Sequence, residues 1–301
     1  MEPQYPLAVI IVSYKNEDMS IRFVKEQVSK ITTPHKIIIV NNAATSESNQ
    51  KYASALDADV VGNPSTNKIN PDSHIFVLNN PVNSGFAIGN NLGAKFVHKH
   101  FHSTYLLFSN NDIRFKNDNV VEELMHKLGS HQEVGIIGPM VRGLNGDYQS
   151  PEPYMSFADR FIWIYLSTPF LSKERKRSRF NLDYAEKARE GYHYRVMGSF
   201  FMVPAKAYFE CGMMDEHTFL YAEEMILSER MLSIGKKTYY DPEVCVIHAH
   251  GATIKKSIPS RKMMNIQFNS NAYYYHHYKK VSKLEIAFGK LVYNILYFIK
   301  S

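Results

Sequence analysis

The stretch "YLLFSNNDIRF", Tyr105 to Phe115, joins an apolar run to an abrupt polar end. Its first part has the length and composition of a buried strand. The residues Ser109, Asn110 and Asn111 then lead to a single carboxylate, Asp112. A turn would explain this end, because Asn and Asp hydrogen-bond their own backbone and tolerate unusual dihedral angles. The surrounding sequence has to decide whether a turn is a sufficient explanation.

Similar apolar runs recur along the first half of the chain, with helix-period segments between them. The strand-like runs cover residues 6–14, 36–42, 74–80, 104–112 and 133–139, and the helix-like segments cover residues 19–31, 86–100 and 119–130. Strands that do not alternate in polarity and are separated by helices indicate a parallel sheet covered on both faces. The first ~140 residues therefore predict a doubly wound α/β unit.

Polar side chains gather where four of these strands end. They are Ser13, Tyr14, Asn41, Asn42, Asn79, Asn80, Asn83, Asn110, Asn111 and Asp112. In an open parallel sheet, ligands bind outside the carboxyl ends of the strands. We interpret this shared position as a site for a polar ligand, and independent Asn turns are the alternative.

Three glycines of "NSGFAIGNNLG" share one face of the helix that follows Asn83. We expect Gly93 to allow tight packing of the helix on the sheet. We expect Gly85, at the helix start, to let a phosphate or a base approach the backbone amides. The sequence contains neither G-x-G-x-x-G nor G-x-x-x-x-G-K-[ST], which disfavours dinucleotide dehydrogenases and P-loop proteins.

The second half of the chain supplies further ionisable candidates. The acids Glu223 and Glu224 follow the apolar "FLY" at a predicted helix start, and a partly desolvated carboxylate there would suit a general base. Stabilisation by the helix dipole is the alternative reading.

His248 and His250 lie on one face of a predicted strand, where a metal site and a structural role are both open. An Asp with a His suits Mg²⁺ or Mn²⁺ bound to a diphosphate. The basic run from Ser172 to Phe180 predicts a solvated loop.

Composition sets the remaining limits. The 301 residues carry a net charge of +6, which suggests an anionic partner such as a phosphorylated substrate, a nucleic acid or a membrane surface. The two cysteines and the absence of a signal-peptide layout predict a cytoplasmic location. The end of the chain, residues 283–301, predicts an amphipathic helix that either packs on the protein or lies on an anionic membrane. No apolar stretch reaches the roughly 20 residues that span a bilayer.

An ordered series of motifs resembles glycosyltransferase family 2, most closely its rhamnosyltransferase-like branch. The motifs are "VIIVSYKN", "IIIVNNA", "NNPVNSGFAIGNNLG", "LLFSNND", "GIIGPMV", "GSFFMV", "FLYAEE" with Arg230, and "VIHAHG". The resemblance implies the GT-A fold, an α/β fold with a Rossmann-like nucleotide-binding sheet and helices on both faces. It implies a GT-A domain over residues 1–255 and a C-terminal helical, membrane-associating segment over residues 256–301.

The family's functional residues map onto positions of this chain. The resemblance implies catalytic roles for Glu224 as the base and Glu223 as its alternative, and a Mg²⁺ or Mn²⁺ site at Asp112 and His248. It implies nucleotide-sugar contacts from Ser13, Tyr14, Asn41, Asn83, Gly85, Asn110 and Asn111. The chain departs from the family where Asn41 and Glu224 each replace a usual Asp, Asn110 replaces a frequent Asp, and Ile226 stands where another acid is common.

The implied activity is inverting transfer of a hexose or deoxyhexose from a UDP- or dTDP-linked sugar. The implied acceptor is a saccharide or a lipid-diphosphate-linked oligosaccharide in bacterial surface polysaccharide synthesis, at the inner face of the plasma membrane. Two alternatives stay open, a basic nucleic-acid-binding protein and a nucleotidyltransferase on a similar sheet. No known nucleic-acid-binding module supports the first, so no nucleic acid is expected.

Overall fold

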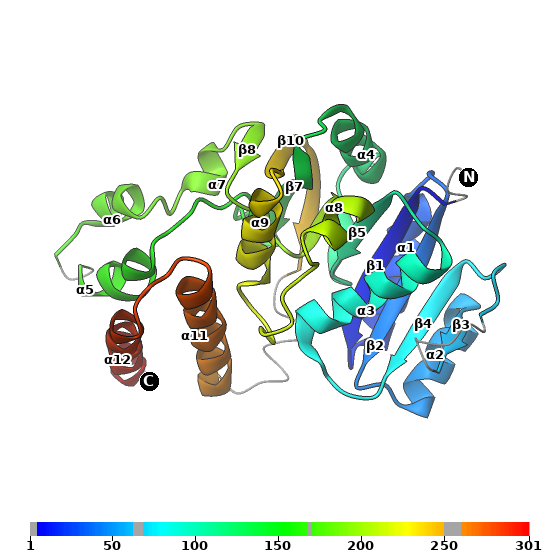
Figure 1. Ribbon diagram of the computed structural model, residues 1–301, viewed down its shortest axis with the longest axis horizontal. Helices are drawn as coiled ribbons and strands as arrows, with labels where there is room; N and C mark the ends of the chain where they lie inside the picture. Colours follow the sequence, from blue (N-terminus) through cyan, green and yellow to red (C-terminus); the bar gives the residue numbers. More distant parts are fainter. Residues whose placement is uncertain (1–4, 63–68, 168–169, 250–259, 301) are drawn as a thin grey trace.

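The computed structural model describes residues 5–62, 69–167, 170–249 and 260–300, with one large central sheet flanked by helices (Figure 1). The strands are β1 (Leu7–Tyr14), β2 (His35–Asn42), β3 (Asp59–Val61), β4 (Ile75–Asn80), β5 (Tyr105–Ser109), β6 (Ile113–Phe115), β7 (Val134–Gly143), β8 (Gly191–His193), β9 (Phe200–Pro204) and β10 (Lys237–His248). Within the described ranges they join in the order β3-β4-β2-β1-β5-β9-β7-β10-β6, and β8 pairs with β10. The predicted α/β class is confirmed.

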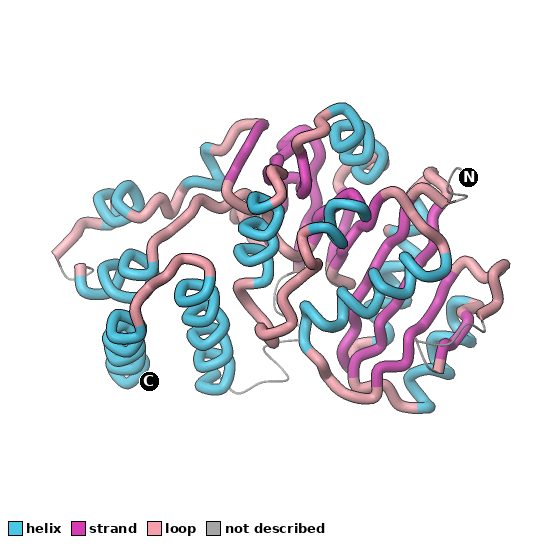
Figure 2. The backbone as a smooth tube through the Cα atoms, viewed as in Figure 1, coloured by secondary structure: helices cyan, strands magenta, loops and turns pink. Residues whose placement is uncertain are grey.

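The helices lie on both faces of the sheet and in a separate group beyond its end (Figure 2). They are α1 (Glu17–Glu26), η1 (Val28–Lys30), α2 (Ser46–Leu56), α3 (Gly85–His100), α4 (Val120–Ser130), the π-helical η2 (Asp159–Trp163), α5 (Ile164–Leu166), α6 (Lys173–Arg179), α7 (Tyr184–Lys187), α8 (Ala205–Glu210), α9 (Glu223–Ser233), α11 (Ser260–His277) and α12 (Lys283–Lys300). Side chains of α1, α2 and α4 pack under one face of the sheet. Side chains of α3, α8 and α9 cover the other face.

The strands expected in the first ~140 residues do run parallel, and a strand from later in the chain is inserted among them. The strands β3, β4, β2, β1 and β5 run parallel, but β9 lies antiparallel between β5 and β7. Both faces of β9 are covered, so its sequence is as uniformly apolar as that of a parallel strand. The polarity pattern therefore gives no information about its direction.

The basic run was expected to be a loop and is instead the short helix α6. The hydroxyl of Ser172 accepts a hydrogen bond from the Arg175 N–H at 3.3 Å, which caps the first turn. An acid, Glu174, lies in the first turn and the basic residues continue through the last turn, as the helix dipole favours. Helix-end electrostatics thus offset the repulsion between like charges.

A third apolar cluster joins α9 to the C-terminal helices. Met225 and Ile226 of α9 pack there with Phe161 of η2, Phe268 of α11 and Tyr293 of α12, whereas Leu227 and Met231 of the same helix pack on the sheet. The helix α9 is therefore shared by two cores. Figure 1 shows α11 and α12 side by side at the end of the molecule farthest from the N terminus.

Gly93 has the packing role expected from the sequence. A Cβ at Gly93 would lie 2.6 Å from Ile10 Cγ2, within the β1 layer of the core. Substitution Gly93→Ala should therefore lower the free energy of unfolding by roughly 1–3 kcal/mol, the usual cost of overpacking. Urea denaturation would measure this change.

Gly62→Ala is the matched control, because a Cβ at Gly62 meets nothing within 4 Å. We expect it to change the free energy of unfolding by less than about 0.5 kcal/mol. Equal destabilisation by both substitutions would contradict the packing role of Gly93.

Candidate active site

The asparagines at the carboxyl edge of the sheet do meet, as their positions predicted. The parallel register places Asn41 of β2 beside Ser13 of β1 and Asn79 of β4. Their amides are largely used within the protein, since Asn41 Nδ2 donates to Ser48 Oγ at 2.8 Å and to Asn49 Oδ1 at 2.9 Å, and Asn49 in turn donates to Asn79. Most of these amide groups therefore hydrogen-bond within the protein and are not free to bind a ligand.

Ser13 is likewise engaged inside the protein. Its hydroxyl is fully buried and lies 2.8 Å from both Ser20 Oγ and Tyr52 Oη, which donate to it. Asn111 Nδ2 extends this chain by donating to Ser20 Oγ at 2.7 Å. The whole of Ser13, backbone included, is buried, so Ser13 offers no surface to a nucleotide, whereas the half-buried Tyr14 lies beyond this buried chain.

The expected role of Gly85 needs correction. Its φ is +85°, and a Cβ there would lie 2.3 Å from the Phe219 carbonyl oxygen. The Gly85 amide donates to Asn83 Oδ1 at 3.2 Å, and the Phe86 amide donates to that same Phe219 oxygen at 3.0 Å. Because the loop before α9 occupies this space, the glycine is needed for packing, and these two amides are not open to a phosphate.

Asp112 and His248 meet at the sheet edge as predicted, with Asp112 Oδ1 3.3 Å from His248 Nε2. Gln149 Oε1 lies 2.9 Å from His248 Nδ1, and an amide oxygen only accepts, so Nδ1 carries the proton. Nε2 then carries the lone pair, with Asp112 Oδ1 and Asn110 Nδ2 each 3.3 Å away, so a cation bound at Nε2 would replace the Asn110 contact. Such outer contacts typically orient a histidine that binds a metal.

This pair fits a divalent cation. Asp112 Oδ1 is buried and accepts no hydrogen bond from any described group. A cation between Asp112 Oδ1 and His248 Nε2 would offset the charge of the carboxylate. Neighbouring ligands of one Mg²⁺ or Mn²⁺ ion, each at roughly 2.1 Å, have a similar separation. In the described ranges no third His, Cys, Asp or Glu joins them, and His250 lies outside those ranges. A cation here would therefore take further oxygens from a ligand such as a diphosphate.

The adjacent acids Glu223 and Glu224 open α9 as predicted, but in different environments. The Glu223 side chain is 2% exposed, and burial, followed by the charge of Glu224, raises the pKa of Glu223 to about 8. The Glu224 side chain is 24% exposed, accepts from the Gly198 amide at 3.2 Å and lies 4.0 Å from the Arg195 guanidinium. Burial therefore favours the protonated form of Glu223, and the more exposed Glu224 is the acid that is accessible as a base.

A strained turn brings these acids into place. Tyr221 and Ala222, which immediately precede Glu223, have φ values of 74° and 71°. Consecutive left-handed residues that are not glycine are costly and persist only where the surroundings impose them. Ser270 Oγ of α11 donates to the Leu220 carbonyl at 2.8 Å, which anchors the turn from outside.

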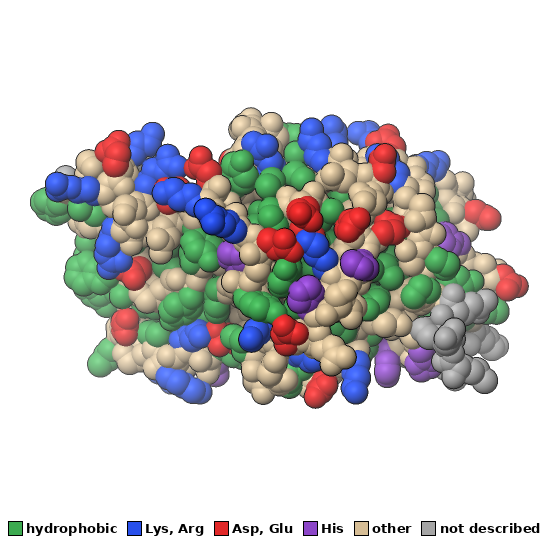
Figure 3. All heavy atoms as spheres, turned by 90° about the horizontal axis from the view of Figure 1, so that it is seen from above, with side chains coloured by type: hydrophobic (Ala, Val, Ile, Leu, Met, Phe, Trp, Pro, Cys, Tyr) green, Lys and Arg blue, Asp and Glu red, His purple; other side chains and the backbone are tan. Residues whose placement is uncertain are grey.

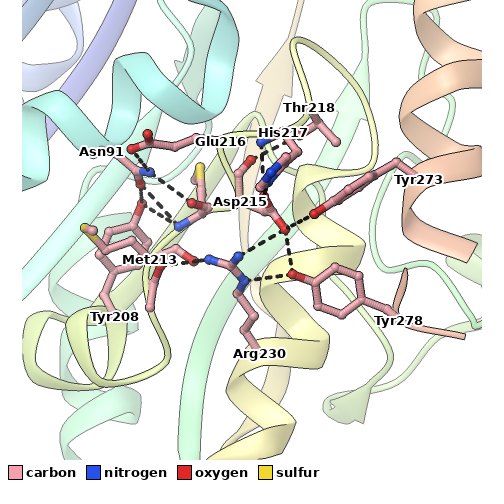
Figure 4. A network of polar contacts seen from close by, with 12 residues as sticks. Asn91, Tyr208, Met213, Asp215, Glu216, His217, Thr218, Arg230, Tyr273 and Tyr278 are labelled. Atoms are coloured by element: carbon pink, nitrogen blue, oxygen red, sulfur yellow. Dashed lines mark hydrogen bonds and ion pairs between the residues drawn. The ribbon is translucent and has the colours of Figure 1, made fainter. Parts of the chain in front are cut away.

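A polar network around Asp215 holds the loop that leads to this turn (Figure 4). Asp215 is 2% exposed and pairs with Arg230 of α9 at 3.0 Å, and it accepts hydrogen bonds from the hydroxyls of Tyr273 and Tyr278. Burial opposes its charge, but the bonds from Tyr278 and His217 and the charge of Arg230 outweigh burial, so the pKa of Asp215 falls well below its usual range. The network therefore ties the loop, α9 and the end of α11 together.

Sequence reasoning missed several residues that shape this site. Gln149 orients His248, and Arg195 lies between Glu152 and Glu224 with 8% of its surface exposed. These residues lie outside the recognised motifs, in the connection between β7 and β9. No local pattern marks them, because their importance depends on contacts made across the fold.

Comparisons with known proteins agree with this geometry. The family model described as "Glycosyl transferase family 2" matches residues 8–197. A search of curated proteins finds no match.

Two solved structures share the fold. A mannosyltransferase, PcManGT from Pyrobaculum calidifontis in complex with GDP-Man and Mn²⁺, has 10% sequence identity and a TM-score of 0.56, covering 93% of this chain and 66% of its own. GalNAc-T7 with UDP, GalNAc and Mn²⁺ has 14% identity and a TM-score of 0.54, covering 82% of this chain and 44% of its own. The chain thus spans less than two thirds of either protein, and the similarity shows the GT-A fold expected from the sequence.

The buried Glu223 predicts a specific pH dependence of stability. Its pKa in the folded state is about 8 and its ordinary value is 4.5, so its stabilising contribution is complete below pH 4.5 and is lost as pH rises to about 8. Glu223→Gln cannot ionise, so its free energy of unfolding should rise relative to the wild type across this window. Urea titrations at pH 5 and pH 8.5 would measure the difference.

The exposed Glu26→Gln is the control and should show no such change relative to the wild type. If Glu223→Gln lowered the free energy of unfolding equally at both pH values, the Glu223 side chain would be buried in its ionised form and not in its protonated form.

Proposed function

The chain belongs to glycosyltransferase family 2, and on that premise we propose that it transfers a sugar from a nucleoside-diphosphate sugar to an acceptor hydroxyl with inversion. The observation that carries this proposal is the Asp112–His248 pair at the sheet edge, which has the donor atoms of a divalent-cation site. The two similar structures hold nucleotides or nucleotide sugars together with Mn²⁺, which supports the same class of donor here. We propose UDP- or dTDP-linked hexoses or deoxyhexoses as donors, as in the rhamnosyltransferase-like branch.

We propose Mg²⁺ or Mn²⁺ as the cation of this site. When bound, such a cation would offset the negative charge of the departing nucleoside diphosphate. Asp112 and His248 would hold it, and Gln149 keeps the lone pair of His248 Nε2 turned toward Asp112. Tyr14, Asn83, Asn110 and Asn111 remain the proposed neighbours of the nucleotide, with Ser13, Asn41 and Gly85 shaping the pocket from behind.

Glu224 is the proposed base. It would accept the proton of the acceptor hydroxyl as that oxygen attacks the anomeric carbon from the face opposite the diphosphate. Glu223 is suited to a different task, because a protonated, buried carboxyl cannot accept this proton near neutral pH. Its charge-free side chain lets two neighbouring acids share one helix turn without mutual repulsion.

Amide substitutions separate the two roles. Glu224→Gln should lower kcat for transfer by roughly 10²–10⁴-fold, the usual worth of a general base, with donor affinity retained. Asp112→Asn should instead abolish the Mn²⁺ dependence of nucleotide binding, because it removes the carboxylate of the pair. Isothermal titration with UDP and dTDP, with and without Mn²⁺, together with turnover of a nucleotide-sugar panel, would measure both effects.

Glu223→Gln is the matched control for Glu224→Gln, and it should affect turnover less. A larger loss at Glu223 would assign the base to that residue. Undiminished Mn²⁺-dependent binding by Asp112→Asn would overturn the metal assignment. Release of pyrophosphate in place of nucleoside diphosphate would identify the nucleotidyltransferase alternative.

We further propose that the acceptor is a saccharide or a lipid-linked oligosaccharide of bacterial surface polysaccharide synthesis. In this proposal residues 1–255 form the transferase part and residues 256–301 attach it to the cytoplasmic face of the membrane. No described helix combines the length and apolarity needed to cross a bilayer. The support for surface attachment is the outer side of α12, where Leu284 is 85%, Phe288 50% and Leu291 56% exposed.

The same end of the molecule carries positive charge suited to anionic lipids. Lys and Arg side chains gather over the region of α5 and α6, beside hydrophobic side chains at the edge of the molecule (Figure 3). Phe170, between these two helices, is 85% exposed. An apolar surface next to basic residues is typical of peripheral membrane binding. The inner side of α12 is packed, with Val292 and Tyr293 buried, so its outer side is available without unfolding.

Removing this apolar surface should release the protein from membranes. The double substitution Leu284→Ser with Leu291→Ser should weaken binding to phosphatidylglycerol-containing vesicles by roughly tenfold or more. Each substitution removes the favourable free energy of transferring a leucine side chain from water into the lipid. Co-sedimentation would measure binding, and donor hydrolysis should remain unchanged.

Leu144→Ser is the matched control, since Leu144 is 67% exposed and directly follows β7. If the wild type failed to bind the vesicles but formed a dimer that the double substitution dissociated, α12 would be a subunit contact and the membrane proposal would be wrong.

A further inference from the structure

The short segment that leads into β9 contacts both carboxylate oxygens of Glu224. The Gly198 amide donates to Glu224 Oε1 at 3.2 Å, and Arg195 Nη1 lies 4.0 Å from Glu224 Oε2. Glu224 itself belongs to α9, so the position of its carboxylate depends on a second element of the fold. The proposed reaction gives neither Gly198 nor Arg195 a task.

The close approach of Glu224 explains why residue 198 is a glycine. A Cβ at Gly198 would lie 2.2 Å from Glu224 Oε1 and 2.7 Å from both Cδ and Cγ of that side chain. Atoms that are not bonded do not pack so closely, so a larger residue at this position would push the carboxylate away from the amide. The φ of Gly198 is not in the left-handed region, so the backbone conformation alone does not require glycine.

The first part of the segment is fixed to the connection that follows β7. The Glu152 amide donates to the Arg195 carbonyl at 2.9 Å, the Arg195 amide donates to the Glu152 carbonyl at 3.3 Å, and the two side chains form an ion pair. The Met197 amide donates to Ser150 Oγ at 3.2 Å. The Arg195 guanidinium, 8% exposed as a residue, is therefore held in place from both its backbone and its side chain.

The last part of the segment contacts the strand end that carries Asp112. The Asn110 amide donates to the Ser199 carbonyl at 2.8 Å, and Asp112 follows two residues later. The segment therefore joins the strand end of the proposed cation site to the proposed base. In an inverting displacement the attacking oxygen and the departing diphosphate lie on opposite sides of the anomeric carbon, so the placement of base and cation relative to each other matters for the rate.

We propose that Gly198 and Arg195 are positioning residues that act through Glu224. They hold its carboxylate in the place that in-line attack requires, and Glu152 keeps the Arg195 guanidinium beside it. The proposal rests on the proposed function and adds the residues that determine where the base lies.

Gly198→Ala tests this proposal, because the three atoms nearest to the added methyl group all belong to the Glu224 side chain, which can move while the backbone stays in place. The assay is Mn²⁺-dependent hydrolysis of UDP- and dTDP-sugars, in which water replaces the acceptor and Glu224 would accept its proton. We expect kcat to fall by roughly 10²-fold, the usual cost of misplacing a reacting group by about 1 Å. UDP affinity in Mn²⁺ and the midpoint of urea denaturation should stay at wild-type values.

Gly129→Ala is the matched control, because a Cβ at this exposed position of α4 would meet Tyr105 Oη at the start of β5. It should hydrolyse the same nucleotide sugars at the wild-type rate.

A Glu224→Ala background separates positioning from a purely structural role. With no carboxylate left to displace, adding Gly198→Ala should leave the residual hydrolysis within about twofold of that of Glu224→Ala alone. Arg195→Gln should also lower kcat with UDP affinity retained, and Arg195→Lys should recover part of the loss because lysine keeps a cation near the carboxylate.

The outcomes distinguish this proposal from the proposed function. If the wild type hydrolysed nucleotide sugars and Gly198→Ala did so equally fast, the positioning role would be wrong while the proposed function stood. An equal loss from Gly198→Ala in the Glu224→Ala background, or a matching loss of UDP affinity, would also overturn it. If the wild type hydrolysed no nucleotide sugar, the proposed function would fail and the positioning role with it. Because Arg195 is buried and its variants could fail to fold, the result for Gly198→Ala decides.

Discussion

The buried ion pair between Asp215 and Arg230 is the interaction on which the arrangement of the active site depends. Asp215 lies within the loop between α8 and α9, and Arg230 belongs to α9. The hydroxyls of Tyr273, in α11, and Tyr278, directly after α11, both donate to Asp215. Removal of the Arg230 charge would leave the Asp215 carboxylate buried without its cation, and breaking a buried ion pair in this way typically costs about 3–5 kcal/mol. The pair thereby sustains the strained turn at Tyr221 and, through it, the position of Glu224.

Two neighbouring acids within one helix turn lie in opposite environments. Glu223 points into the protein and retains its proton, whereas Glu224 remains near the Arg195 guanidinium and the solvent. Neighbouring acids in unlike surroundings are typical of sites that use acid–base chemistry. The adjacent Ile226 fits this arrangement, because it is fully buried in the cluster with the C-terminal helices, where another acid would lack a partner.

The sequence was informative where local periodicity or chain order carries the signal. Strand and helix alternation predicted the α/β class, and parallel strand ends predicted that Ser13, Asn41 and Asn79 would lie side by side. It was uninformative where a contact joins distant segments, as in the antiparallel direction of β9, the use of Asn41 within the protein and the role of Gln149. Gly85 shows the limit most clearly, because its missing Cβ suits a phosphate and the Phe219 carbonyl equally well, and only the fold distinguishes them.

The division of α9 between two cores has a consequence for how such enzymes can diverge. Leu227 and Met231 need the sheet, whereas Met225 and Ile226 need side chains from η2 and α11. In a hybrid that took α11 and α12 from a relative, the side chains packed against Met225 and Ile226 would change and would no longer fit them. This misfit would lie directly behind the proposed base. Recombination between relatives should therefore succeed when η2, α9 and the C-terminal helices are inherited as one block, even though they are far apart along the gene.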